Sequence, residues 1–227
     1  MKSESGMSAQ LPQGFRYAAT YAGIRKVAKD DLALIVSDKP AVAASVFTQN
    51  RVAAAPVVIA KANLKASKGK ATAILVNAGN ANCATRTGEK VALETIRAAA
   101  KALNVKPEQV LPASTGVIGV EMDGSKIVKA LPGLVASLDA AKFDAAAGAI
   151  LTTDTVAKTA YAEIKVGKKV VRIAGMTKGA GMIQPNMATT LGFVTTDADV
   201  SAAVLRTSLK NAINRSYNRI SVDGDTS

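Results

Sequence analysis

The chain alternates between short apolar runs and segments in which apolar residues recur every three or four positions. Short runs are typical of strands buried in a sheet, whereas the longer spacing is typical of helices with one buried face. We therefore predict strands at the four apolar runs that precede residue 80, which are 31–38, 41–47, 56–60 and 71–77.

The first predicted helix follows Thr87, a residue type that can cap a first helical turn. Pro107 is predicted to end this helix. Its apolar residues share one face, as expected for an amphipathic helix: Ala92, Ile96, Ala99 and Leu103. A strand at 109–111 is predicted next, leading into a glycine-containing turn at 112–119 with the sequence PASTGVIG.

Two helical stretches follow, at 125–138 and 140–151, and the first is predicted to be interrupted near Pro132 and Gly133. The segments 161–166 and 169–173 then form a predicted β-hairpin.

The C-terminal part is predicted to contain a strand at 193–196 and a helix that Asp199 or Ser201 could cap. The apolar stripe of this helix consists of Leu205, Leu209, Ile213 and Tyr217. Because strands and helices are mixed along the whole chain, we predict an α/β fold. We expect one domain over 13–227, preceded by a disordered tail at 1–12.

Composition restricts the chemistry. The 227 residues include no histidine and only one cysteine, Cys83. Ser-His-Asp and Cys-His catalysis and His-ligated zinc are therefore excluded, and we expect no metal site. Any acyl-transfer chemistry must take its base from a carboxylate, a lysine or an α-amine.

The net charge of +12 could favour nucleic acid, an anionic membrane or small anionic substrates. Lysines and arginines are scattered along the chain rather than interleaved with aromatic residues, so we expect no nucleic-acid partner. No apolar run approaches the roughly 18 residues that a membrane span needs, and no secretory signal is recognisable. We expect a soluble cytoplasmic protein without a membrane partner.

The least regular segment, 175–193, reads GMTKGAGMIQPNMATTLGF. Its glycines permit backbone conformations that could bring a side chain onto its own carbonyl. The Thr189 hydroxyl could attack the Ala188 carbonyl, and hydrolysis of the resulting ester would leave a free α-amine on Thr189. An α-amine titrates near ~7.7–8.0, so it can act as a base near neutral pH. The alternative is a glycine-rich turn that leads into a buried strand.

The segment 178–193 resembles the self-cleaving segment of the ornithine acetyltransferase (glutamate N-acetyltransferase) family. Four further segments resemble the family in the same order: VNAGNANCATRTG (76–88), PASTGVIG (112–119), TTDT (152–155) and SVDGDTS (221–227). The resemblance covers nearly everything after residue 12. It implies a layered sandwich of mixed β-sheets flanked by helices, as in the related N-terminal-nucleophile aminopeptidases.

The resemblance also implies roles for particular residues. Cleavage would fall between Ala188 and Thr189, and Thr189 would be the nucleophile that carries the acetyl group. The Thr115 hydroxyl and the Gly116 N–H would form the oxyanion hole. The substrate-binding residues would be Thr152, Lys178 and Thr189.

The implied reaction moves an acetyl group from N2-acetyl-L-ornithine to L-glutamate in arginine biosynthesis, without a cofactor, and some relatives also use acetyl-CoA as donor. Self-cleavage would give residues 1–188, which contain the potential α chain 13–188, and residues 189–227, the start of a β chain. The resemblance implies that the two chains stay together and assemble further. Two departures from the family stand out: Gln184 replaces a frequent histidine, and the family's second half is missing. The alternatives are a related aminopeptidase or amidase and a truncated non-catalytic relative.

Overall fold

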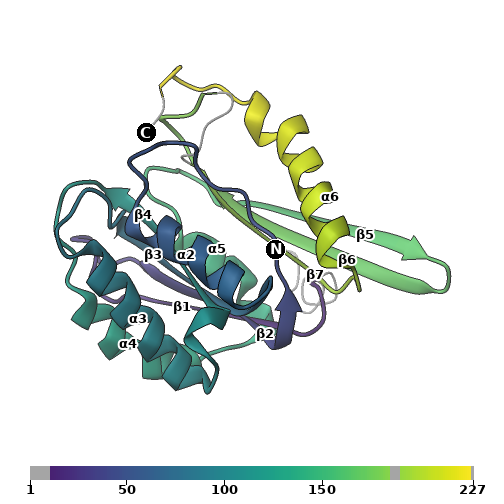
Figure 1. The fold of residues 1–227 in the computed structure, drawn as a ribbon, viewed down its shortest axis with the longest axis horizontal. Helices are drawn as coiled ribbons and strands as arrows, with labels where there is room; N and C mark the ends of the chain where they lie inside the picture. Colours follow the sequence, from purple (N-terminus) through teal and green to yellow (C-terminus); the bar gives the residue numbers. More distant parts are fainter. Residues whose placement is uncertain (1–10, 185–189, 226–227) are drawn as a thin grey trace.

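The computed structural model describes residues 11–184 and 190–225, and it contains two β-sheets with helices on their faces (Figure 1). The four-stranded sheet has the order β1-β2-β3-β4 and the three-stranded sheet the order β5-β6-β7. This architecture confirms the predicted α/β class and the layered arrangement of mixed sheets.

The four-stranded sheet is antiparallel except where β4 pairs in parallel with β3. Its strands are β1 (Phe15–Thr20), β2 (Leu32–Val42), β3 (Lys70–Asn80) and β4 (Val110–Val117). The first six residues of β2 are all buried, because helices cover both faces of the sheet there. The predicted strands at 31–38 and 71–77 are confirmed within β2 and β3.

Helices α2 (Ala55–Ala66), α3 (Gly88–Leu103) and α4 (Gly124–Ala136) belong with one hydrophobic core of this sheet. Helix α5 (Phe143–Ala149) lies on the opposite face and contributes to a second core that also contains residues of β6. The second core therefore joins the two sheets. Single 3-10 turns complete this part: η1 (Pro107–Gln109) and η2 (Ala140–Lys142).

The three-stranded sheet is antiparallel and consists of β5 (Lys158–Val166), β6 (Lys169–Lys178) and β7 (Leu191–Thr196). Its β5–β6 hairpin, which is longer than predicted, extends away from the body of the molecule (Figure 1). Helix α6 (Ala202–Arg215) follows, with the turn η3 (Tyr217–Arg219) after it. Ser201 caps α6 by accepting a hydrogen bond from the Val204 N–H, which confirms one of its two predicted caps.

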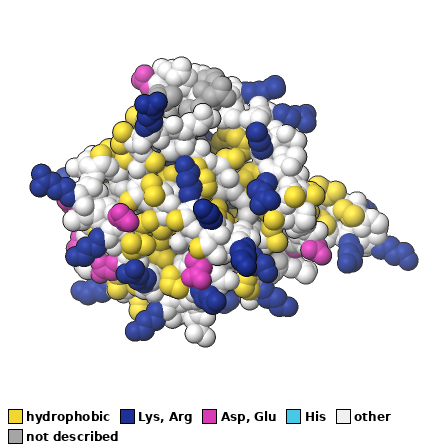
Figure 2. Space-filling model, viewed as in Figure 1, with side chains coloured by type: hydrophobic (Ala, Val, Ile, Leu, Met, Phe, Trp, Pro, Cys, Tyr) yellow, Lys and Arg dark blue, Asp and Glu magenta, His cyan; other side chains and the backbone are white. Residues whose placement is uncertain are grey.

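The predicted apolar stripe of α6 is the less exposed side of this helix, although none of the helix's described residues is fully buried. Lysine and arginine side chains are spread over the visible face of the molecule (Figure 2). No helix in the described part of the chain has the length and apolar character needed to cross a bilayer.

Two strand predictions are wrong. The run at 56–60 lies in helix α2, where Pro56 occupies the first turn and its missing N–H costs no hydrogen bond. Of the run at 41–47, only Ala41 and Val42 belong to a strand, at the end of β2. An unbroken apolar run carries no period of its own, so the sequence could not separate a buried helix from a strand.

Several predicted boundaries also need correction. Helix α3 ends at Asn104, which adopts a left-handed conformation with φ 54°, before Pro107 is reached. Thr87 occupies the N-cap position of α3, but its side chain makes no capping hydrogen bond; its hydroxyl donates to the Glu121 carboxylate. Helix α4 continues through Pro132 without interruption. Leu11, placed by the sequence in a disordered tail, is buried in the second core, while residues 1–10 lie outside the described residues.

The segment 112–119 was predicted as a turn, but residues up to Val117 belong to β4. Parallel pairing with β3 keeps this segment extended as far as Val117, even though it contains Gly116. The predicted helical stretch at 140–151 is confirmed as η2 followed by α5.

Tyr17 ties the two sheets together through its ring and its hydroxyl. The side chain is fully buried, its ring makes an edge contact with Phe143 at 5.1 Å between centroids, and its hydroxyl lies 2.9 Å from Thr195 Oγ1. Burial raises the pKa of Tyr17 to about 12, although the hydrogen bond with Thr195 opposes this shift. The folded state therefore holds the Tyr17 proton more tightly than the unfolded state does.

This shift predicts alkaline destabilisation through Tyr17. Because its pKa is raised on folding, the associated stability is present below pH 10 and lost as the pH rises from 10 to about 12. The loss should approach about 2–3 kcal/mol, measured as the free energy of urea unfolding at each pH. In Tyr17→Phe this pH-dependent part should disappear. An identical alkaline slope in the two proteins would contradict the prediction.

Candidate active site

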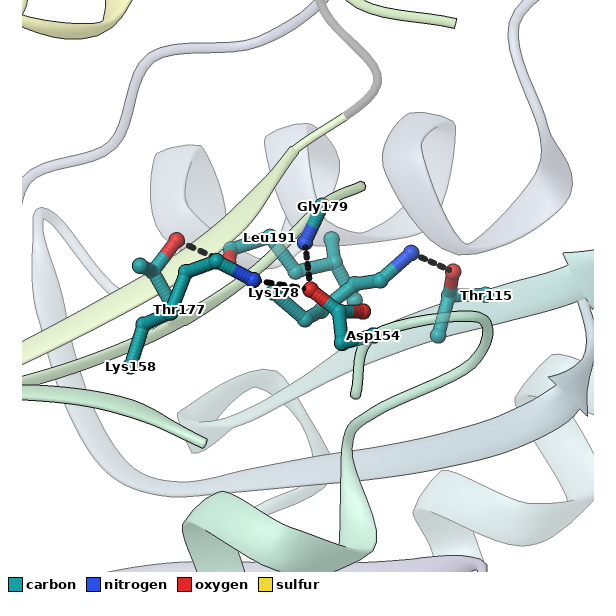
Figure 3. A network of polar contacts seen from close by, with 7 residues as sticks. All are labelled: Thr115, Asp154, Lys158, Thr177, Lys178, Gly179 and Leu191. Carbon is teal, nitrogen blue, oxygen red and sulfur yellow. Dashed lines mark hydrogen bonds and ion pairs between the residues drawn. The ribbon is translucent and has the colours of Figure 1, made fainter. Parts of the chain in front are cut away.

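The candidate site lies where the carboxyl ends of β3 and β4 meet the end of β6. Thr115 lies in β4 opposite Ala78, and Lys178 is the last residue of β6. The Lys178 Nζ donates a hydrogen bond to Thr115 Oγ1 at 3.0 Å (Figure 3). Two residues named from separate motifs are thus in direct contact, although they are 63 positions apart in the chain.

Gly116 allows β4 to pass unusually close to β3. Its φ is +135°, and a Cβ placed there would lie 2.2 Å from the Gly79 carbonyl carbon and 2.4 Å from the Asn80 N. The strand register is irregular at the same point, between Gly79 and Asn80. Only glycine fits this position, and the backbone next to Thr115 is therefore rigidly determined.

Lys178 lies in a low-polarity, positively charged environment. The residue is only 7% exposed, and burial lowers the pKa of its ammonium group. Nearby Asp154 opposes this change, whereas the positive charges of Lys158 and Arg25 add to it. Three cations and one carboxylate thus act on the same region, and this balance favours an anionic ligand such as a carboxylate.

Asp154 is the carboxylate at the centre of this cluster, and its side chain is completely buried. It accepts hydrogen bonds from Lys158 Nζ at 2.5 Å and from the Gly179 N–H at 2.8 Å (Figure 3). Burial raises the pKa of Asp154, but these two hydrogen bonds and the positive charge of Lys158 outweigh it, so the net shift is downward. Asp154 belongs to the TTDT segment at 152–155, but no role for it was predicted from the sequence.

Thr152 lies two residues before Asp154 and is half-buried. The Arg25 guanidinium holds the chain just before it by donating to the carbonyl oxygens of Ala149, at 3.3 Å, and Leu151. Arg25 is a second residue of this region that the sequence did not single out, since only the fold brings its segment to the end of α5.

The segment that leads to the predicted cleavage site is held by polar contacts. The Asp223 carboxylate accepts hydrogen bonds from the N–H groups of Met182, at 2.6 Å, and Ile183, at 3.0 Å. Met182 has a positive φ of 54°. The Val222 N–H also donates to the Ile183 carbonyl at 2.9 Å. Val222 and Asp223, which belong to a family-like segment, therefore fix the chain a few residues before the predicted cleavage site.

Ala188 and Thr189 themselves lie outside the described residues. On the other side of them, Leu191 pairs with Lys178 in the β6–β7 ladder, and its carbonyl accepts a hydrogen bond from Thr177 Oγ1 at 2.8 Å. The Thr190 Oγ1 would lie 3.1 Å from a Cβ built on Gly179. Thr190 and Leu191, which follow the predicted cleavage site, therefore lie beside Gly179 and opposite Lys178, respectively.

Among the residues that the structure describes, no group of three or more His, Cys, Asp or Glu side chains is arranged to hold a metal ion. Cys83 is partly buried in the loop after β3. Asn80 and Asn82 organise this loop, since Asn80 Oδ1 accepts from the Asn82 N–H at 2.7 Å and Asn82 Nδ2 donates to the Gly88 carbonyl at 2.8 Å. Both asparagines therefore have a structural role in this loop.

These features define a class: an α/β protein with two packed sheets and a polar site, rich in positive charge, between a strand end of one sheet and a strand end of the other. A lysine and a threonine hydroxyl meet there, beside a segment predicted to cleave itself.

The chain belongs to the ArgJ family, whose sequence profile matches residues 16–227. It is 49% identical over 216 residues to the "Arginine biosynthesis bifunctional protein ArgJ" of Gloeobacter violaceus, which covers 95% of this chain and 53% of the relative. The chloroplastic protein of the same description from Physcomitrium patens is 51% identical, with 95% of this chain and 42% of the relative covered. The chain thus spans about half the length of these relatives.

Two solved structures share the fold. The argJ protein of Bacillus halodurans matches with a TM-score of 0.73 and 35% identity, covering 78% of this chain and 92% of that one. Ornithine acetyltransferase of Mycobacterium tuberculosis, crystallised with ornithine, matches with a TM-score of 0.68 and 33% identity, covering 78% and 95%. The family resemblance inferred from the motifs is confirmed.

Proposed function

We propose that this chain carries the nucleophile and the oxyanion-binding part of an acetyltransferase that moves the acetyl group of N2-acetyl-L-ornithine to L-glutamate in arginine biosynthesis. The observation that carries this proposal is the 3.0 Å hydrogen bond from Lys178 to Thr115, made opposite the start of β7. It joins a cation suited to an amino-acid carboxylate with a hydroxyl suited to an oxyanion, next to the chain that begins at Thr189.

The contact also leaves the Thr115 hydroxyl in the right state for this role. An ammonium group has only donors, so the Thr115 oxygen must accept from Lys178 and its own proton stays free to be donated. With the Gly116 N–H it would stabilise the negative oxygen of a tetrahedral intermediate. Lys178 and Thr152 would bind the substrate.

The reaction proceeds in two halves. Thr189 Oγ attacks the acetyl carbonyl of N-acetylornithine while its proton passes to the Thr189 α-amine and on to the departing ornithine amine, leaving an acetyl ester. The α-amine of glutamate then attacks the ester, and N-acetylglutamate leaves as the threonine hydroxyl is restored. Acetyl-CoA could supply the same acetyl group, and no bound cofactor is needed.

Self-cleavage between Ala188 and Thr189 would give residues 1–188, which contain the potential α chain 13–188, and a piece that begins at 189. The β6–β7 ladder and the contacts of Val222 and Asp223 would keep the two together. The lengths of related chains support this proposal. The alignment with the crystallised Bacillus halodurans chain covers 78% of this chain and 92% of that one, so the two chains are of similar length. The curated relatives are about twice as long, as expected if family members are divided into two chains. We further propose assembly into a larger oligomer in the cytoplasm.

Two alternatives differ in measurable ways. A related aminopeptidase or amidase would release the acyl group to water instead of glutamate. A non-catalytic relative would keep the chain intact and would form no acetyl-enzyme.

Intact-mass spectrometry tests the proposal directly. Freshly purified protein should give two fragments divided between Ala188 and Thr189, and incubation with N-acetylornithine should add one acetyl mass to the fragment that begins at Thr189. Addition of glutamate should remove that mass and produce N-acetylglutamate. A fully cleaved protein that never gains the acetyl mass would contradict acetyl transfer, and an intact chain would contradict the self-cleavage.

Replacing Thr115 by valine should slow acetylation of Thr189 by about 10²–10³-fold, because one oxyanion donor is worth roughly 2.7–4 kcal/mol of barrier. The apparent affinity for N-acetylornithine should change little, as judged from the acetylation rate at increasing substrate concentration. Ser114→Ala is the matched control, since the neighbouring Ser114 hydroxyl donates to Asn77 Oδ1 instead. Weaker substrate binding without slower acetylation would remove Thr115 from the oxyanion role.

A further inference from the structure

We propose that Asp154 is a positioning residue of this site: its buried carboxylate, paired with Lys158, fixes the backbone at Gly179, directly after Lys178. The functional part of this inference rests on the proposed acetyl transfer, whereas the electrostatic part can be tested without it. The described contacts of Asp154 do not include Thr115, so we infer that it acts through its neighbours.

The geometry separates Asp154 from an ordinary surface ion pair. Its partner Lys158 lies four positions later, which alone would suggest a weak pair at the start of β5. However, the Asp154 side chain has no exposed surface, while that of Lys158 is 42% exposed. The carboxylate also accepts the Gly179 N–H at 2.8 Å, from a segment 25 positions away. A buried carboxylate that joins two distant segments is held in one orientation.

Gly179 is the residue at which the chain turns from β6 toward the predicted cleavage site. Its φ is +150°, and a Cβ there would come within 3.1 Å of both Ile183 Cδ1 and Thr190 Oγ1. The hydrogen bond to Asp154 therefore fixes the backbone immediately after Lys178 and beside Thr190. In Figure 3 Asp154 lies between the side chains of Lys158 and Lys178.

The negative charge of Asp154 also acts on Lys178. Lys178 is buried beside the positive charges of Lys158 and Arg25, and all three influences disfavour its ammonium form. Among the groups of the described residues that act on Lys178, Asp154 alone is negative. Removing its charge should therefore release the Lys178 proton more easily, whereas removing the charge of Lys158 should have the opposite effect.

Reductive methylation of lysine amines, followed by mass spectrometry of the peptide that contains residue 178, tests this opposition of signs. Only the neutral amine reacts, so at pH 8 Asp154→Asn should raise the rate at Lys178 several-fold, because the negative charge that favours the ammonium form is lost. Lys158→Gln should lower that rate. Asn can still accept the Gly179 N–H, so the first variant removes the charge and preserves the shape.

A purely structural role would loosen the site in both variants and speed up labelling in both. An increase in Lys158→Gln, or no increase in a folded Asp154→Asn, would overturn the electrostatic part. If circular dichroism shows that Asp154→Asn does not fold, the direction in which Lys158→Gln changes the methylation rate at Lys178 still tests the electrostatic part.

The functional arm compares Asp154→Asn with Asp154→Ala. The Asn variant should still cleave between residues 188 and 189, but the pH profile of Thr189 acetylation should shift to lower pH. The Ala variant also loses the Gly179 contact and should cleave at least tenfold more slowly. Equal cleavage rates in these variants and the wild type would overturn the backbone role. A wild-type chain that neither cleaves nor gains an acetyl group would refute the proposed function, while the labelling result would still decide the electrostatic role of Asp154.

Discussion

The Thr189→Ala protein should remain a single chain of full mass and should gain no acetyl group from N-acetylornithine. Alanine has no hydroxyl to attack the Ala188 carbonyl, and no histidine exists anywhere in the sequence to activate a substitute. The expected effect is complete loss of both steps, measured by intact mass after purification and after incubation with substrate. Thr189→Ser keeps a hydroxyl and should still cleave.

Thr190→Ala provides the matched control for this experiment. Thr190 lies beside Gly179 and is covalently joined to Thr189, so its replacement disturbs the same segment without removing the predicted nucleophile. We expect cleavage to persist in Thr190→Ala. An unchanged split in Thr189→Ala would identify an outside protease as its cause. Loss of cleavage in Thr190→Ala alone would show that the attacking hydroxyl belongs to Thr190 and not to Thr189.

The Gly116→Ala protein should be strongly destabilised and should lose acetylation. A Cβ at residue 116 would lie 2.2 Å from the Gly79 carbonyl carbon, so β3 and β4 must separate at the point where Thr115 is positioned. Overpacking and a positive φ of +135° both oppose the change, and together they should cost about 3–5 kcal/mol. For a chain of this size we expect the midpoint of thermal unfolding to fall by about 10 °C or more.

Gly133→Ala is the control for that measurement. Gly133 lies within α4, has open space where a Cβ would be, and lacks a positive φ. Alanine should stabilise the helix there by roughly 0.4–1 kcal/mol. Circular dichroism at increasing temperature would compare the two variants. A Gly116→Ala protein as stable as the wild type would show that β3 and β4 do not approach each other this closely.

The pattern of the sequence was sufficient where structure depends on neighbours along the chain. The β5–β6 hairpin, the amphipathic face of α3 and the Ser201 cap of α6 all follow from local spacing or turn chemistry. The motifs, through their family resemblance, likewise indicate Thr115, Gly116 and Lys178. The contact between Lys178 and Thr115 could not be predicted, because it joins two sheets.

Other local patterns gave the wrong answer because tertiary contacts outweighed them. The apolar run that begins at Pro56 is equally compatible with a strand, but in the fold it is a helix packed on the four-stranded sheet. The segment 112–119 contains turn residues, yet pairing with β3 makes most of it a strand.

By itself, the sequence determined the α/β class, the family and the residue types able to transfer an acyl group without histidine. Only the tertiary structure decided that Arg25 and Asp154 act on Lys178 and that Asp223 holds the chain at residues 182 and 183, because these groups come from segments far apart in the chain. A hydrogen bond or a buried charge depends on distance in space, and spacing along the sequence carries no record of it when the partners lie tens of residues apart.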